Sequence, residues 1–280
     1  MTKEEKTDFW VKFWGVRGSV ACPGEDTVRY GGNTSCLEVH CGDYNFIFDA
    51  GTGLKNLGDS LPPGKQLNYD IFLTHSHMDH MNGFPFFKPA YSPATRLKIW
   101  AGHLKPKGKS IEAVTRNLMD QPFFPITVDL LSATLIFNDF TYGEELEISD
   151  KITLQTAPLN HPGGGTGYRV NYGGRSFCYV TDTEHVPGKM DENILKLIEG
   201  TDLLVYDSNF TDEEFSDYVS WGHSTWQEGV RLSNAAGVKT FIAFHHDPSH
   251  TDKVMDEIAG ELEAERPGSL VAKEGMTLYI

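Results

Sequence analysis

The sequence predicts a mixed α/β fold in which helices cover the faces of a mixed β-sheet. Short strand-like runs bounded by Gly, Asn, Asp or Pro recur along the chain, and segments with helical patterning are fewer. The early strands follow one another as hairpins, whereas the later strands alternate with helices. That order favours helices packed on a sheet over an all-β or an all-α protein.

The individual elements follow in chain order from apolar patterning, turn residues and capping residues. Strands are expected at residues 11–14, 35–40, 45–49, 69–74, 97–100, 151–156, 167–171, 176–181, 203–207 and 240–244. Helices are expected at residues 81–87, 111–120, 192–199, 224–236 and 252–265, several of which open with Ser, Asp or Asn.

The chain is expected to form one domain over residues 1–280, because no repeat or linker divides it. Residues 84–131 interrupt the rhythm of strands and helices with prolines interleaved among aromatic side chains. This stretch is predicted to be an insertion that forms a lid or wall over a site.

Composition and charge narrow the classes of function. The 280 residues carry 24 Lys+Arg against 39 Asp+Glu, a formal charge of −15. This acid excess disfavours a broad phosphate-binding face for nucleic acid, although a small basic patch is compatible with it. The longest apolar runs, such as 241–244, are far shorter than the roughly 20 residues that span a bilayer.

A cytoplasmic location is expected from the N-terminal residues and the cysteines. Residues 1–6 are rich in charge and lead into no apolar signal region. The cysteines form no CxxC pair, which is typical of reduced thiols; they are Cys22, Cys36, Cys41 and Cys178.

A dense group of metal-binding residue types follows one apolar strand. Residues 69–74 lead into His75-Ser-His77-Met-Asp79-His80, with three imidazoles and one carboxylate in six positions. In an extended chain His75 and His77 point to the same side and can hold one cation, while Asp79 and His80 can face a second. Imidazole with carboxylate suits zinc, manganese or iron. The segment therefore predicts a site for two cations.

This HxHxDH segment resembles the signature of the metallo-β-lactamase superfamily, and further segments match in the superfamily's order. The resemblance implies an αββα sandwich in which Asp49 braces the metal loop, His161 is a ligand and Asp182 bridges the two ions. The last histidine ligand falls at His245 or His246. Spacing does not settle the choice, and the family's usual pattern favours His245.

The resemblance also implies how the ligands are shared between two ions. The first ion is expected on His75, His77 and His161, and the second on Asp79, His80 and His245, with Asp182 between them. Zinc is the expected metal, with manganese as the alternative.

A Gly-His-Ser-Thr segment at residues 222–225 narrows the branch of the superfamily. It resembles the extra histidine of the phosphodiesterase branch, which contains tRNA 3′-processing endonucleases and cyclic-nucleotide phosphodiesterases. The resemblance implies that His223 stabilises the phosphate or protonates the leaving oxygen. Asp79 and His223 are therefore the expected catalytic residues. The structural alternative is a helix cap in which only Ser224 or Thr225 matters.

The predicted function is hydrolysis of a small phosphodiester, with 3′,5′-cyclic nucleotides as the favoured substrates. Trimming of tRNA 3′ ends is the alternative in the same branch, and a thioester or lactone hydrolase or a metal-dependent sensor stays open. No membrane partner is expected, and the charge disfavours long nucleic acid as a partner. The resemblance implies a homodimer. Aromatic residues of the insertion, including Phe123 and Phe124, can offer faces for base stacking.

Overall fold

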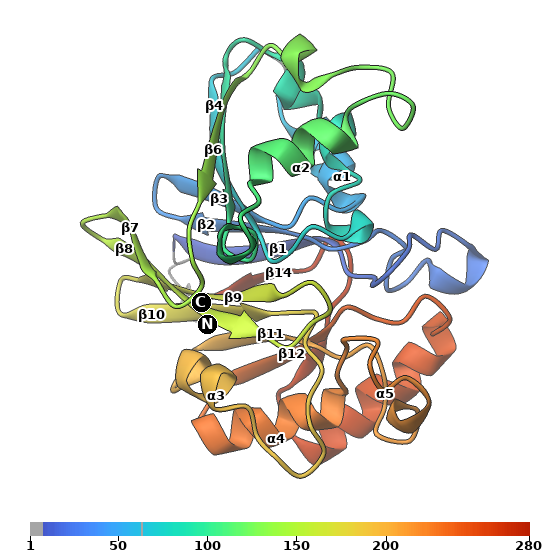
Figure 1. Cartoon of the computed structure of the whole chain (residues 1–280). Helices are drawn as coiled ribbons and strands as arrows, with labels where there is room; N and C mark the ends of the chain where they lie inside the picture. The colour runs from blue at the N-terminus through green and yellow to red at the C-terminus, as the bar shows by residue number, and fades with distance from the viewer. Residues whose placement is uncertain (1–7, 63) are drawn as a thin grey trace, which may run out of the picture.

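Two seven-stranded sheets form the centre of the computed structural model, which describes residues 8–62 and 64–280 (Figure 1). The first sheet has the order β14 (Thr277–Tyr279), β1 (Phe9–Gly15), β2 (Cys36–Cys41), β3 (Tyr44–Phe48), β4 (Leu67–Leu73), β5 (Thr95–Ala101) and β6 (Thr134–Asp139). The second has the order β13 (Leu270–Val271), β12 (Thr240–Phe244), β11 (Leu203–Asp207), β10 (Arg175–Val180), β9 (Gly165–Tyr172), β8 (Ile152–Leu159) and β7 (Glu145–Ser149).

Both sheets mix antiparallel and parallel neighbours. In the first sheet β1, β2 and β3 pair antiparallel, and β3 to β6 run parallel. In the second sheet β7 to β10 pair antiparallel, and β10 to β13 run parallel. Loops that leave the carboxyl ends of parallel strands gather at one edge, where ligand sites of open α/β sheets usually lie.

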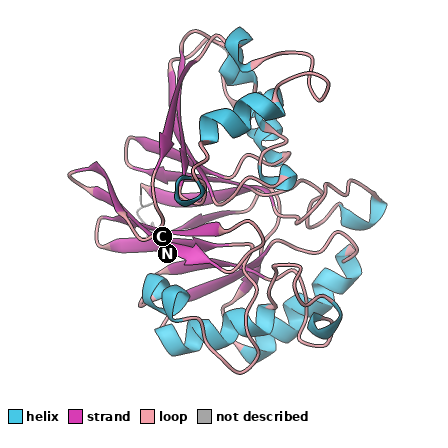
Figure 2. Cartoon of the chain, in the orientation of Figure 1, coloured by secondary structure: helices cyan, strands magenta, loops and turns pink. Residues whose placement is uncertain are grey.

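Three apolar layers hold the sheets and helices together. Phe72 of β4 packs between the sheets with Phe177 of β10, whereas its neighbour Ile71 faces the opposite side of the sheet. Helices α1 (Gly53–Ser60) and α2 (Ile111–Leu118) cover the outer face of the first sheet (Figure 2). Helices α3 (Glu192–Ile198), α4 (Trp226–Ala236) and α5 (Asp252–Glu265) cover the second. This layering confirms the predicted α/β class and the αββα sandwich.

The predicted helix at residues 81–87 is wrong. Short 3-10 turns occupy this region, at Met78–His80 and Phe84–Phe86. Pro85 lacks the N–H that a continuing helix requires, and the Gly83 N–H donates to Ala50 O at 2.9 Å instead of a helical partner. Helix α1 was not predicted, because its sequence GLKNLGDS contains two glycines, which disfavour a helix.

Residues 84–131 contribute to both the first sheet and its outer layer. They contain β5, which pairs with β4 and β6, and helix α2. That this stretch is an insertion stays a prediction. The charged segment 1–6 lies outside the described residues. Within the described part of the chain, no helix has the length and apolar character needed to cross a bilayer.

Candidate metal centre

The loop after β4 is shaped by a buried carboxylate at the end of β3. Asp49 accepts hydrogen bonds from the Thr74 N–H at 2.8 Å and from the Thr74 hydroxyl at 3.0 Å. Its other oxygen lies 2.8 Å from His80 Nδ1 and accepts from the Tyr179 hydroxyl at 2.9 Å. Because Asp49 holds Nδ1, the Nε2 atom of His80 is left free to face a cation. This is the bracing role predicted for Asp49.

Three further strands bring the remaining side chains to the same edge. His161 follows β8, Asp182 follows β10 and His245 follows β12. Asp182 and His245 adopt the left-handed backbone region with φ of 57° and 65°, and Asp49 does so with φ of 60°. Such conformations are unfavourable for residues with a Cβ, and they cluster at sites where the surrounding structure enforces them.

The predicted ligands form two adjacent groups. One contains His75, His77 and His161, and the other contains Asp79, His80, Asp182 and His245; within each group the ligand atoms lie within 4.8 Å of one another.

Asp182 faces both groups. Its Oδ1 lies 3.7 Å from His75 Nε2 and 3.9 Å from His161 Nε2. Its Oδ2 lies 3.2 Å from both His80 Nε2 and His245 Nε2. A carboxylate that turns one oxygen to each group has the geometry of a bridge between two ions.

The chemistry of these residues fits divalent cations. Atoms bound to one tetrahedral ion at about 2.1 Å stand about 3.4 Å apart, close to the observed separations. His75 Nε2 is buried without a hydrogen-bond partner among the described residues, which an ion would satisfy. Burial holds the pKa of His75 well below its usual range, so the imidazole is in the neutral form that binds metal.

The carboxylates of the second group are ionised. Burial acts to raise the pKa of Asp79, but nearby His80 and a hydrogen bond with His245 hold that pKa far below its usual range. The Ser19 N–H also donates to Asp79 Oδ2 at 2.8 Å. Asp79, Asp182 and Asp49 thus place three carboxylates in a buried space, and their negative charge favours a cation there.

His223 lies beside both groups and is held by a partner of its own. Its Nδ1 is 3.1 Å from Asp207 Oδ2 and 3.7 Å from Asp182 Oδ1. Burial acts to lower the pKa of His223, but the charge of Asp207 raises it to about 9. Thr225 meanwhile caps α4 by accepting from the Glu228 N–H at 3.1 Å. The segment therefore contains both a helix cap and a histidine that faces the site.

The family comparison decides the class of protein. Residues 44–246 match the family described as the β-lactamase superfamily domain, which covers more than half of the chain. The chain belongs to the metallo-β-lactamase superfamily. With its clustered histidines and carboxylates, this superfamily member is a metal-dependent hydrolase. The predicted family is confirmed.

Known proteins resemble this superfamily member along nearly its whole length. Ribonuclease Z of Exiguobacterium sp. is 27% identical over 285 residues, covering 86% of this chain and 92% of that protein. The metallo-β-lactamase fold protein YhfI from Bacillus subtilis superposes with a TM-score of 0.71 at 21% identity, over 96% of this chain and 99% of YhfI. A diphosphatase of the PhnP family gives 0.71 at 18% identity, over 97% of each chain. These two structures share its fold.

The other histidines of this metallo-β-lactamase superfamily chain stand outside the two groups. His246 turns away and its Nε2 donates to Ala272 O at 2.9 Å, so His245 alone of the adjacent pair faces the cluster. His103 contacts the Ser76 hydroxyl at 3.2 Å, His185 contacts Ser224, and His250 contacts Glu214.

Several supporting residues were not predicted from the sequence. Asn209 donates to His245 O at 2.8 Å and so fixes the strained backbone of that residue. The buried Arg17 guanidinium donates to Gly31 O, Asp247 O and His250 O, and thereby ties the N-terminal loop to the segment after β12. The sequence shows only that Arg17 and Asn209 are polar, and this does not reveal a hydrogen-bond partner far along the chain.

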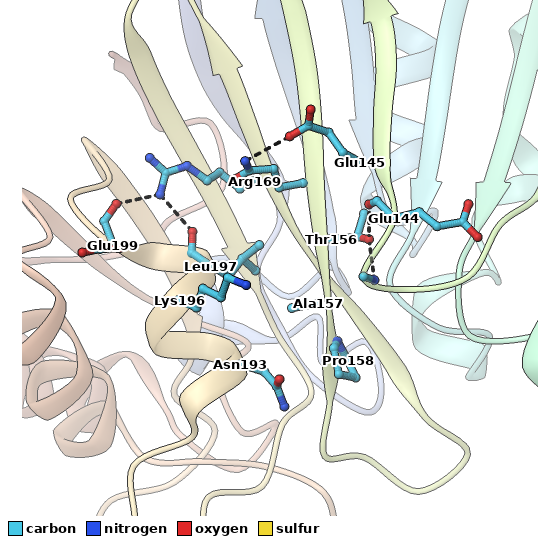
Figure 3. Close-up of a pocket in the computed structure, with 12 residues that line it drawn as sticks. Glu144, Glu145, Thr156, Ala157, Pro158, Arg169, Asn193, Lys196, Leu197 and Glu199 are labelled. Carbon is cyan, nitrogen blue, oxygen red and sulfur yellow. Dashed lines mark hydrogen bonds between the residues drawn. The ribbon is translucent and has the colours of Figure 1, made fainter.

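A separate cavity of about 560 Å³ lies between β8, β9 and α3 (Figure 3). It contains none of the clustered histidines. The guanidinium of Arg169 there donates to Leu197 O at 2.9 Å and to Glu199 O at 2.7 Å. Arg169 is therefore engaged in satisfying carbonyls at the carboxyl end of α3.

Proposed function

We propose that this chain hydrolyses phosphodiester bonds at a pair of divalent cations, and that its substrate is a small nucleotide such as a 3′,5′-cyclic nucleotide. The observation that carries the proposal is the placement of Asp182 between two ligand groups, with His223 3.7 Å away from it. Paired cations suit displacement at phosphorus, because charge develops on both the attacking and the leaving oxygen.

The ligand roles follow the two groups. We propose that one ion is held by His75, His77 and His161, the other by Asp79, His80 and His245, and that Asp182 contacts both. Zinc is the proposed metal and manganese the alternative. The ions would supply Lewis-acid activation of a water molecule and of the phosphoryl oxygens.

The protein's own residues orient the reaction and move its protons. Asp49 fixes the imidazole of His80, and Asp207 holds His223 Nδ1, so that Nε2 of His223 is the atom that can deliver a proton. We assign this proton to the leaving oxygen, a role that commonly contributes about 10²–10⁴-fold to the rate. We also assign a catalytic role to Asp79, whose carboxylate accepts a hydrogen bond from the Ser19 N–H at 2.8 Å.

Two observations favour a small substrate. The chain carries a formal charge of −15, which opposes the approach of a long polyanion. His161 and Asp182 are joined by β9 and β10, which pair closely along their length and leave no long segment between them to grip a distant part of a nucleic acid.

Cleavage of a precursor tRNA is the second candidate. The similarity to a protein named ribonuclease Z favours it. A local group of positively charged side chains also favours this candidate; it consists of Lys105, Lys107 and Lys109. Lys107 Nζ donates a hydrogen bond to Gly163 O, in the loop that follows His161. Such a group could contact the phosphates of an RNA strand.

Turnover by protein loaded separately with zinc and manganese tests both candidates. The substrates are 3′,5′-cyclic mononucleotides and a precursor tRNA, with Asp182→Ala as the inactive variant and Asp70→Asn as a matched buried-carboxylate control. Metal-dependent release of nucleoside monophosphates, lost only in Asp182→Ala, supports the proposal. Cleavage of the tRNA alone transfers the assignment to the second candidate. Inactivity on every phosphodiester, with two ions bound, refutes both.

We further propose a single-domain homodimer located in the cytoplasm. The described cysteines are all free, as expected for a reducing compartment. A light-scattering mass equal to one chain would refute the dimer.

A further inference from the structure

A column of aromatic rings runs from His223 to the protein surface. The His223 ring meets Phe210 edge to face, with centroids 6.2 Å apart. Phe210 stacks on Tyr218 at 4.3 Å with an interplanar angle of 7°, and Tyr218 meets Trp221 edge to face at 5.3 Å. Phe210 is buried, whereas Trp221 is 62% exposed. The column therefore ends in a large aromatic face presented to solvent.

The backbone around Trp221 is held in an unusual conformation. Ser220 before it and Gly222 after it both have positive φ, of 76° and 89°. The Gly222 carbonyl accepts from His161 Nδ1 at 2.8 Å, and a Cβ at Gly222 would lie only 2.4 Å from that nitrogen. The Gly222 N–H donates to Glu184 Oε2 at 2.9 Å. Trp221 is thus one residue from a direct contact with a predicted metal ligand.

We propose that Trp221 is a specificity-determining residue that stacks on a base of the nucleotide substrate. This inference rests on the proposed function and adds to it the part of the substrate that is recognised. The positive φ of Ser220 costs free energy in a residue with a Cβ, and such outliers cluster at active sites and ligand-binding segments. A base has an aromatic face on either side, and stacking of this kind does not require a particular base.

Other exposed aromatics have no comparable link to the centre. Phe123 is 84% exposed, but its segment is connected through Phe124 to Phe86, in the layer outside the first sheet. Tyr44 begins β3, at the end of the strand opposite Asp49. Trp221 is joined to His223 through only two intervening rings, those of Phe210 and Tyr218. The ring contacts that lead from Tyr44 towards His223 pass instead through the apolar core between the two sheets.

The test compares two phosphodiesters with the same leaving group. The p-nitrophenyl ester of thymidine 5′-monophosphate carries a base, and methyl p-nitrophenyl phosphate does not. Trp221→Ala is expected to raise the KM of the nucleotide ester by about tenfold and to leave kcat and the methyl ester unchanged, because base stacking adds binding without chemistry. Trp221→Phe should restore most of the affinity, and Tyr44→Ala should match the wild type.

A binding measurement makes the result independent of turnover. Thymidine 5′-monophosphate should quench tryptophan emission of the wild type, and Trp221→Phe should abolish that quenching. Equal KM changes for the two esters, or quenching that survives in Trp221→Phe, would overturn the inference. A change in mass on light scattering in Trp221→Ala would do so too, by placing Trp221 in a subunit interface. If wild-type protein with two ions cleaves neither these esters nor the 3′,5′-cyclic nucleotides and the precursor tRNA, the proposed function fails, and quenching still decides whether Trp221 binds a base.

Discussion

Replacing Asp49 by Asn should weaken metal binding without removing any predicted ligand. The carboxylate accepts from the Thr74 N–H on one oxygen, and its other oxygen faces His80 Nδ1 and the Tyr179 hydroxyl, at 2.8 to 2.9 Å. An amide offers a single acceptor oxygen, so its NH₂ group must face at least one of these donors. Removing an orienting partner of this kind typically costs 10–100-fold in metal affinity, which is about 1.4–2.8 kcal/mol.

Competition with a chelator of known affinity measures the effect of Asp49→Asn. The matched control is Asp70→Asn, which alters a largely buried carboxylate of the same sheet that accepts from Trp100 Nε1 at 2.7 Å. The control should keep wild-type metal affinity. The reasoning is refuted if Asp49→Asn binds both ions as tightly as the wild type, or if Asp70→Asn loses the same affinity. A Tyr179→Phe variant should fall between them, because it removes one donor and leaves the carboxylate.

Three further outcomes are expected. His223→Asn should lower kcat about 10²–10⁴-fold for substrates with an alkoxide leaving group, but far less for p-nitrophenyl esters, because p-nitrophenoxide leaves without being protonated. Equal losses of kcat for both kinds of substrate in steady-state assays would exclude His223 as the proton donor. Gly18→Ala places a Cβ 2.6 Å from the His245 ring and should displace that ring. We therefore expect kcat/KM to fall about 100-fold and elemental analysis to find less bound metal. A variant that still binds the full amount of metal would contradict this. Burial lowers the pKa of His103 to about 3, whereas a histidine in the unfolded chain has a pKa of about 6.5. Between these two pH values the unfolded chain binds a proton that the folded protein does not. The free energy of unfolding therefore falls as pH drops from about 6.5 towards 3, by up to about 1.4 kcal/mol per pH unit. Urea unfolding of wild type and His103→Asn should differ in this slope, and parallel curves would remove the explanation.

Local patterning determined most of the architecture. The bounds of β11, β12 and α5 agree with the prediction, because continuous apolar runs and capped helical periods are properties of adjacent residues. The helix predicted at residues 81–87 failed where the Gly83 N–H bonds to Ala50 O, a partner that local patterning does not reveal. Helix α1 was missed because its packing against the sheet outweighs the poor propensity of its glycines.

The sequence alone identified the residue types of the metal centre, since six positions after one strand carry three imidazoles and a carboxylate. Spacing left the choice between His245 and His246 open, the family pattern favoured His245, and the tertiary structure supplied the physical reason. The left-handed φ of 65° turns His245 into the cluster, while a hydrogen bond to Ala272 O holds its neighbour on the other side. The direction of a side chain depends on backbone conformation and distant contacts, which sequence spacing does not encode. For the same reason the ring column that ends at Trp221 became visible only once the chain was folded.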